Sequence, residues 1–194
     1  MGYTPDKKAQ KKKQAAGSGT LDGVKSQWQQ KKPVLFFVLG FAVLMVLFYV
    51  VLLSDYFQKN IQVKIIAVDA SISSFILNIF GMNTKTSREM ILSPEFSISI
   101  ARGCDALEAM GLFASALLSF PARWKHKLIG FFAGIAILFA LNIGRIISLY
   151  LTGVHFPKAF EFMHVEVWQG IFILFALGLW IFWIRWTRKE ATNA

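Results

Sequence analysis

Long runs of apolar residues, separated by short polar segments, dominate the sequence. The four clearest runs cover residues 33–53, 106–120, 128–151 and 165–186. A helix needs about 20 predominantly apolar residues to cross the hydrocarbon core of a membrane. The run at 106–120 is shorter than that, but it can extend into the residues before it. The pattern therefore predicts an all-α polytopic membrane protein with about four transmembrane helices.

A fifth stretch, residues 61–82, mixes apolar residues with Lys64, Asp69, three serines and Asn78. Helical spacing collects these polar residues on one face. Such a face is typical of a helix that lies in the membrane interface or packs against protein, and not of a helix surrounded by lipid. We therefore expect an interfacial or partly embedded helix here.

The distribution of positive charge sets the expected topology. Residues 1–32 contain eight lysines and two aspartates, and the segments 121–127 and 185–189 are also basic. Short segments rich in Lys and Arg beside membrane spans face the cytoplasm. All three segments can do so only if the chain crosses the membrane an even number of times between them. Four spans satisfy this condition and five do not, which leaves residues 54–104 and 152–164 on the outer side.

Composition divides the chain into three parts. Residues 1–32 have few large apolar side chains and are predicted to form a disordered basic cytoplasmic tail. Residues 33–189 form the membrane domain, and residues 190–194 form a short cytoplasmic tail. Beside a span, a basic tail indicates contact with anionic membrane lipid, so we expect no nucleic-acid partner. The single cysteine excludes a disulfide framework within the chain, and we expect neither a metal nor a cofactor.

The segment before the single cysteine changes its periodicity. Residues 95–102 alternate between apolar residues and serines, which predicts a short outward-facing strand. Asp105 and Glu108 then have the spacing of a capping box, so we expect a helix to begin beside Cys104. The positive end of that helix lowers the pKa of a neighbouring thiol.

The predicted topology places three chemically capable side chains on the outer side. Cys104 and His164 precede the second and fourth spans, and Arg145 lies about 9 Å inside the outer end of the third. Asn142 lies one turn deeper on the same helix face, and polar groups so placed face protein or a water-filled cavity. Cysteine, histidine and a cation suffice for acyl transfer. Histidine moves the thiol proton to the leaving amine, and arginine stabilises the oxyanion or positions the substrate.

Asn142 and three nearby carboxylates are candidates for substrate-binding or supporting roles. Asp105 and Glu108 are better explained as helix caps than as catalytic groups. Glu161 precedes His164 by three residues, so it either orients the imidazole or is a solvated surface charge.

The segments GCDALE at 103–108 and NIGR at 142–145, followed by His164, resemble the exosortase/archaeosortase family over about residues 60–186. The resemblance implies a polytopic cysteine transpeptidase whose functional trio corresponds to Cys104, Arg145 and His164. Many members have Cys-Ser-Gly at the nucleophile and about eight spans. This chain has Cys-Asp-Ala at that position and is long enough only for the core spans of the family. It therefore looks most like a short form such as the H subgroup.

The resemblance also implies a substrate and a location. The substrate is a secreted, membrane-anchored protein whose C-terminal sorting tail consists of a short motif, a transmembrane helix and a basic end. The enzyme cuts near the motif and passes the new C-terminus to a surface acceptor, which is a lipid, a glycan or water. The expected location is the bacterial inner membrane, with the active site on the periplasmic side. Pairing of the motif with residues 95–102 by β-addition is a further hypothesis.

Two other functions remain open from the sequence. One is a non-catalytic membrane subunit or small transporter in which Arg145 and Asn142 line a polar path. The other is redox sensing through Cys104, which needs an intermolecular partner because the chain has one cysteine only. The sequence does not indicate an oligomeric state.

Overall fold

The computed structural model describes residues 31–192. The predicted basic tail therefore lies outside the described residues, except for Lys31 and Lys32, which begin the N-terminal helix. The elements that follow are mostly helical. They are the N-terminal helix (Lys31–Leu52), α2 (Asp55–Phe57), the π-helical η1 (Gln58–Gln62), α3 (Val63–Ile79), β1 (Lys85–Ser87), β2 (Met90–Leu92), β3 (Ser97–Ser99), α4 (Leu107–Ser119), α5 (Trp124–His155), the 3-10 turn η2 (Pro157–Ala159), α6 (Phe160–Phe162), the π-helical η3 (Met163–Val167) and α7 (Trp168–Thr192).

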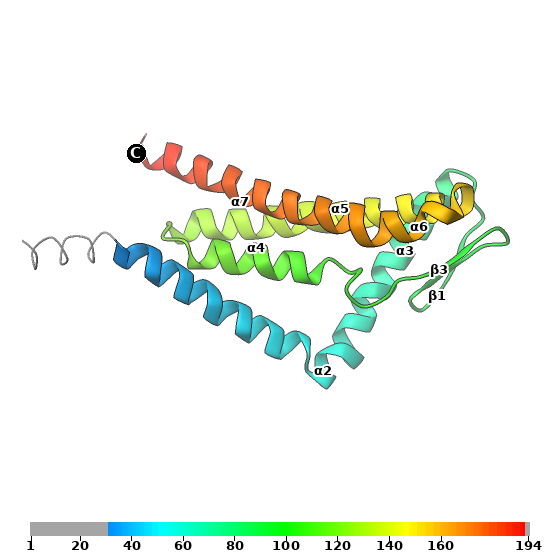
Figure 1. The fold of residues 1–194 in the computed structure, drawn as a ribbon, viewed down its shortest axis with the longest axis horizontal. Coiled ribbons are helices and arrows are strands. Elements are labelled where there is room, and N and C mark those ends of the chain that lie inside the picture. The colour runs from blue at the N-terminus through cyan, green and yellow to red at the C-terminus, as the bar shows by residue number, and fades with distance from the viewer. Residues whose placement is uncertain (1–30, 193–194) are drawn as a thin grey trace, which may run out of the picture.

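Helices α5 and α7 run along most of the length of the molecule, whereas the N-terminal helix and α4 end near its middle (Figure 1). The N-terminal helix begins at the same end where α4 turns into α5 and where α7 finishes. The small sheet and α6 lie at the opposite end. The described parts of the three basic segments, namely residues 31–32, 121–127 and 185–189, thus lie at one end, which is the arrangement that the charge pattern predicts. The fold is that of a largely helical, polytopic membrane protein, as expected.

The lengths of α3 and α4 differ from the sequence prediction. The helix that contains α3, Asp55–Ile79, is long and apolar enough to cross a membrane, whereas α4 has only 13 residues. Even so, α4 runs along α5 and α7, while α3 is inclined and stays in the half of the molecule that holds the sheet (Figure 1). The polar side chains Asp69 and Ser73 of α3 are fully buried. We therefore interpret α3 as a partly embedded helix whose polar face meets protein.

Two apolar cores hold these elements together. At the sheet end, Ile66 of α3, Ile98 of β3 and Tyr150 of α5 belong to one cluster. Phe113 of α4 and Leu138 of α5 belong to a second cluster that also includes residues of α7. A side chain at Gly134 of α5 would collide with the Phe113 ring, so a small residue there lets α4 and α5 approach closely.

The sheet has the antiparallel order β1–β2–β3, which makes β3 an edge strand. The predicted alternation is confirmed, because Ile98 and Ile100 are buried while Ser97 and Ser99 are exposed. Phe96 fixes this strand to α5, since its ring fills the space that a side chain at Gly153 would need. The sequence did not predict β1 and β2, which are three residues long each.

Candidate active site

Cys104 lies in a tight loop between β3 and α4. Two residues of this loop have positive φ angles, Gly103 at 88° and Ala106 at 56°. Glycine adopts such an angle at no steric cost, whereas alanine is strained there. A strained backbone persists only where the surrounding structure holds it in place. The loop therefore needs anchors on both sides of the cysteine.

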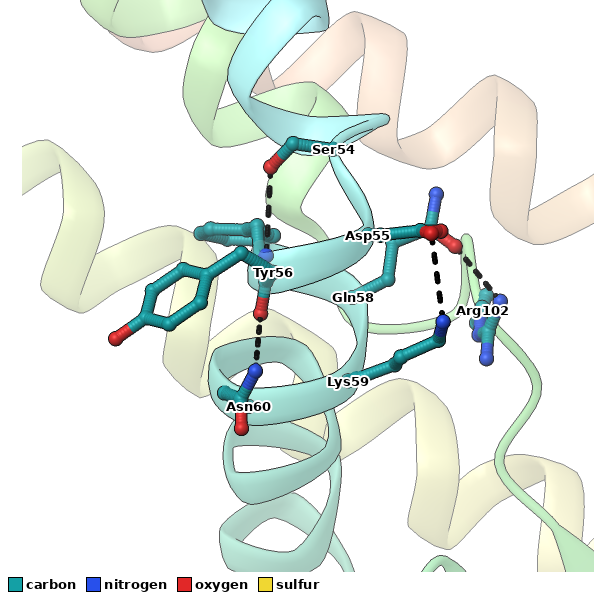
Figure 2. A network of polar contacts seen from close by, with 8 residues as sticks. Ser54, Asp55, Tyr56, Gln58, Lys59, Asn60 and Arg102 are labelled. Atoms are coloured by element: carbon teal, nitrogen blue, oxygen red, sulfur yellow. Dashed lines mark hydrogen bonds and ion pairs between the residues drawn. The ribbon is translucent and has the colours of Figure 1, made fainter.

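The anchors come from the π-helical turn η1. Gln58 accepts a hydrogen bond from the guanidinium of Arg102 at 2.8 Å, as Figure 2 shows. Gln62 donates to the carboxylate of Asp105 at 2.7 Å, and both of these side chains are buried. Since the two glutamines are four residues apart, they lie on one helix face. The two hydrogen bonds from this face hold the chain in place at Arg102 and at Asp105, on either side of Cys104.

The predicted capping box is wrong. Helix α4 begins at Leu107 with Ala106 as its N-cap, and the Asp105 carboxylate accepts from the Leu107 amide at 3.3 Å. Glu108 is exposed and makes no hydrogen bond back to the helix start in the described part of the chain. Asp105 still has a structural role, because it ties the start of α4 to Gln62.

The thiol of Cys104 contacts the imidazole of His164. The Sγ to Nε2 distance is 3.0 Å, which is hydrogen-bond distance. His164 belongs to η3, the π-helical turn that precedes α7. Such turns are rare and occur frequently at functional sites. The ring of Phe160 packs edge-on against the imidazole at a centroid distance of 5.8 Å and restricts its orientation.

Arg145 completes this cluster from α5. Its Nη2 lies 3.7 Å from the Cys104 Sγ and 3.5 Å from the backbone oxygen of His164. The guanidinium also lies over the ring of Phe172, at 5.5 Å from its centroid. We call Cys104, Arg145 and His164 the reactive cluster.

The charge of Arg145 has no carboxylate partner in the part of the chain that the structure describes. The side chain is only 8% exposed, yet no carboxylate in residues 31–190 lies within ion-pair distance of it. Its Nε is buried without a hydrogen-bond partner in the same part of the chain. A buried cation without a counter-ion favours a negative charge on any neighbouring group. The groups that can acquire such a charge here are the thiol of Cys104 and a substrate oxygen.

The environment of Cys104 raises the pKa of its thiol. Burial is the main cause, the charge of Asp105 adds to it, and the charge of Arg145 opposes it. The expectation of a thiol acidified by a helix N-terminus is therefore wrong, since α4 begins three residues later and burial dominates. A thiol of this kind is neutral near pH 7 and needs a base to remove its proton.

Behind the reactive cluster lies a set of polar side chains that we call the buried polar layer, namely Gln62, Asp69, Asn142 and Asp105. Asn142 donates to the carboxylate of Asp69 at 3.1 Å, and both side chains are completely buried. Asn142 is thus on the same face of α5 as Arg145, as predicted, but it lines neither cavity of the site. Gln62 and Asp69 were missed as site residues, although the polar face of residues 61–82 was a signal for them.

The remaining acidic candidates lie outside the reactive cluster. Glu161 is exposed and makes no hydrogen bond to His164, and Glu108 lies on the wall of a cavity. No group of three or more His, Cys, Asp or Glu side chains in residues 31–192 is placed to hold a metal ion.

Two cavities meet at the reactive cluster, and each is lined by Cys104, Arg145 and His164. The larger has a volume of about 450 Å³ and extends between the N-terminal helix, α4 and α7. The smaller has a volume of about 200 Å³ and extends along β3. A reacting group at Cys104 is therefore accessible from a helix-lined side and from a strand-lined side.

Comparison with known proteins gives one match. The family described as transmembrane exosortase matches residues 32–184, which is most of the chain and includes every residue of the reactive cluster. No match was found among curated proteins or among solved structures. The extent of the family match is decisive for classification: this chain is a member of the transmembrane exosortase family.

Proposed function

We propose that the protein is a membrane-embedded cysteine endopeptidase and transpeptidase that cleaves the C-terminal sorting tail of secreted proteins. The observation that carries this proposal is the contact of 3.0 Å between the Cys104 Sγ and the His164 Nε2, beside an arginine that has no carboxylate partner among the described residues. A neutral thiol next to a base and a cation is the arrangement that acyl transfer requires.

In the proposed reaction, His164 accepts the thiol proton while Cys104 Sγ attacks the scissile carbonyl carbon. The guanidinium of Arg145 stabilises the negative charge that develops on the carbonyl oxygen. The carbon–nitrogen bond then breaks, His164 gives its proton to the leaving amine, and a thioester to Cys104 remains. An acceptor amine, hydroxyl or water then loses a proton to His164 and attacks the thioester. The carbon–sulfur bond breaks, and His164 returns the proton to the thiolate of Cys104.

The larger cavity supports a substrate with a membrane helix. Its walls include Met45 of the N-terminal helix, Leu112 of α4 and Ile173 of α7, all of them apolar. A cleft between membrane helices with this apolar wall suits the helix of a sorting tail, because helices associate in lipid through close packing. In the same proposal, the sheet end of the molecule faces the periplasm and the basic end faces the cytoplasm of a bacterial cell.

Replacement of the nucleophile tests this function. The probe is a secreted reporter that ends in the C-terminal tail of a protein from the same genome, consisting of a motif, an apolar helix and a basic end. We expect Cys104→Ala to lower processing by about 10⁴-fold or more while the variant accumulates in membranes. Wild-type processing by Cys104→Ala would refute the proposal and would leave the subunit or transporter function.

A further inference from the structure

We propose that the free edge of β3 is the docking site for the extended segment of the substrate that carries the scissile bond. This inference rests on the proposed function and specifies how the substrate is held. The segment adds to β3 as a fourth strand, fills the smaller cavity and leads its scissile carbonyl to Cys104.

Hydrogen bonding within the sheet shows which groups of β3 are free. The Ser93 amide donates to the Phe96 oxygen, and the Ile100 amide donates to the Glu89 oxygen. Residues of an antiparallel strand alternate between those that bond to the neighbour and those that point away from it. Ile98 therefore bonds to β2, in register with Ile91.

Ser97 and Ser99 consequently direct their backbone amides and carbonyls away from β2. Both residues are exposed, and neither bonds to another residue in the described part of the chain through these groups. A row of unpaired amides and carbonyls is a template for a further strand. The edge thus offers one donor and one acceptor at each of two alternate positions.

The smaller cavity leads from this edge to the reactive cluster. Residues 96–100 form one wall, Phe160 and His164 contribute to another, and Ile146 and Leu149 of α5 add apolar surface. Cys104 and Arg145 line the same cavity. A peptide paired with Ser97 and Ser99 therefore lies in the cavity that opens onto the nucleophile.

The cavity also selects side chains. Successive side chains of a strand point to opposite faces of the sheet, so alternate substrate residues face α5 together with Ile98. These residues meet Ile146 and Leu149, which favour apolar or small side chains. The intervening residues lie on the face of Ser97 and Ser99, which is exposed. We expect the recognised motif to tolerate charge at every second position.

The opposite edge of the same sheet supplies a matched control. Thr86 of β1 pairs with Ile91. Because Ile91 already bonds to β3, Thr86 directs its amide away from the sheet. Thr86 is exposed and lines neither cavity of the site. Proline at 86 or at 99 thus removes one outward amide and leaves the ladder hydrogen bonds intact.

The first experiment measures processing of the reporter described above by these variants. We expect Ser99→Pro to lower kcat/KM about tenfold or more, because the added ring blocks the edge and removes a donor. Thr86→Pro stays within about twofold of the wild type, since it keeps the amide of residue 99. The alkylation rate of Cys104 by a small neutral reagent must stay unchanged in Ser99→Pro, which shows an undisturbed nucleophile.

The second experiment does not depend on proline and uses the inactive Cys104→Ala background. Ser97→Cys is combined with single cysteines along the reporter motif, and disulfide formation is measured under mild oxidation. Pairing with β3 predicts crosslinking yields that rise and fall with a period of two residues. If Ser99→Pro fails to accumulate, this scan alone decides whether the substrate pairs with β3.

The two proposals fail in different ways. Full activity of Ser99→Pro, or a crosslinking scan without a period of two, overturns the docking edge while the loss of activity in Cys104→Ala still supports the proposed function. Processing by Cys104→Ala at the wild-type rate overturns the function itself. Loss of activity in Ser99→Pro together with an equal loss in Thr86→Pro also overturns the docking edge, because the effect then belongs to the sheet as a whole.

Discussion

The reactive cluster and the buried polar layer are neighbours made of similar residue types, yet their surroundings differ. Cys104, Arg145 and His164 line both cavities. Asp69 and Asn142 are completely buried and bond to each other. Arg145 and Asn142 are one turn apart on α5, so a single helix face serves both groups.

This difference in accessibility separates side chains that a substrate can reach from side chains that support the fold. A polar group can react only where a substrate reaches it, and of these two groups only the reactive cluster lines the cavities. The buried polar layer instead joins α3 to α5 and to the loop of Cys104. Substitutions in the two groups should therefore affect different quantities: the rate of the chemical step in one, and the stability of the fold in the other.

The largest effect within this comparison is expected from Arg145→Gln. Loss of the charge that is proposed to stabilise the oxyanion should lower kcat by about 10² to 10³-fold, with a small change in KM. Processing of the reporter by purified enzyme measures both constants. Arg145→Lys should recover part of the rate, because it restores the charge without the planar fork. A decrease in kcat smaller than about fivefold for Arg145→Gln would show that Arg145 supports the fold, like the buried polar layer, and does not act in the chemical step.

A smaller effect, on stability, is expected from Asn142→Ala. The substitution leaves the buried Asp69 carboxylate without its donor, which should cost about 1 to 2 kcal/mol. The midpoint of thermal unfolding in detergent should fall, while processing well below that midpoint stays within about fivefold of the wild type. Thr152→Ala is the control, since its hydroxyl bonds only within α5, to Ser148. A stable Asn142→Ala variant with abolished activity would contradict the separation.

The smallest effect concerns the ionisation of Cys104. Because burial raises the pKa of the thiol, its alkylation rate should continue to rise above the pH at which an ordinary thiol is fully ionised. Arg145→Gln should move this profile to higher pH and Asp105→Asn to lower pH, in line with the sign of each charge. A profile that is already flat near pH 7 would show a preformed thiolate instead. The same labelling with an impermeant reagent on intact cells reports on which side Cys104 lies.

The sequence predicted the helical architecture well, because long apolar runs and basic segments are strong local signals. It also predicted that Cys104, Arg145 and His164 lie on one side, and the structure brings their side chains into contact. The alternation around Ile98 was sufficient to predict β3. In each case the information lies within one segment or in the order of segments.

Contacts between distant segments were harder to predict from the sequence. Asp105 has the spacing of a cap, but its carboxylate bonds to Gln62, 43 residues away, and the left-handed Ala106 shifts the helix start. The polar face of α3 was recognised, yet periodicity does not tell whether such a face meets water, lipid headgroups or protein. The acidifying effect expected for Cys104 failed for the same reason, since burial depends on the whole fold.

The shortness of α4 has a consequence for the thioester of the proposed reaction. Thirteen residues span about 20 Å, whereas the hydrocarbon core of a bilayer is about 30 Å thick. If Ser119 lies at one surface of the membrane, the start of α4 at Leu107 lies about 10 Å below the other surface, close to the loop of Cys104. Bulk water is scarce at that depth, so we expect the thioester to persist until an acceptor diffuses to it within the bilayer. The length of one helix would then bias the enzyme towards transfer and away from hydrolysis.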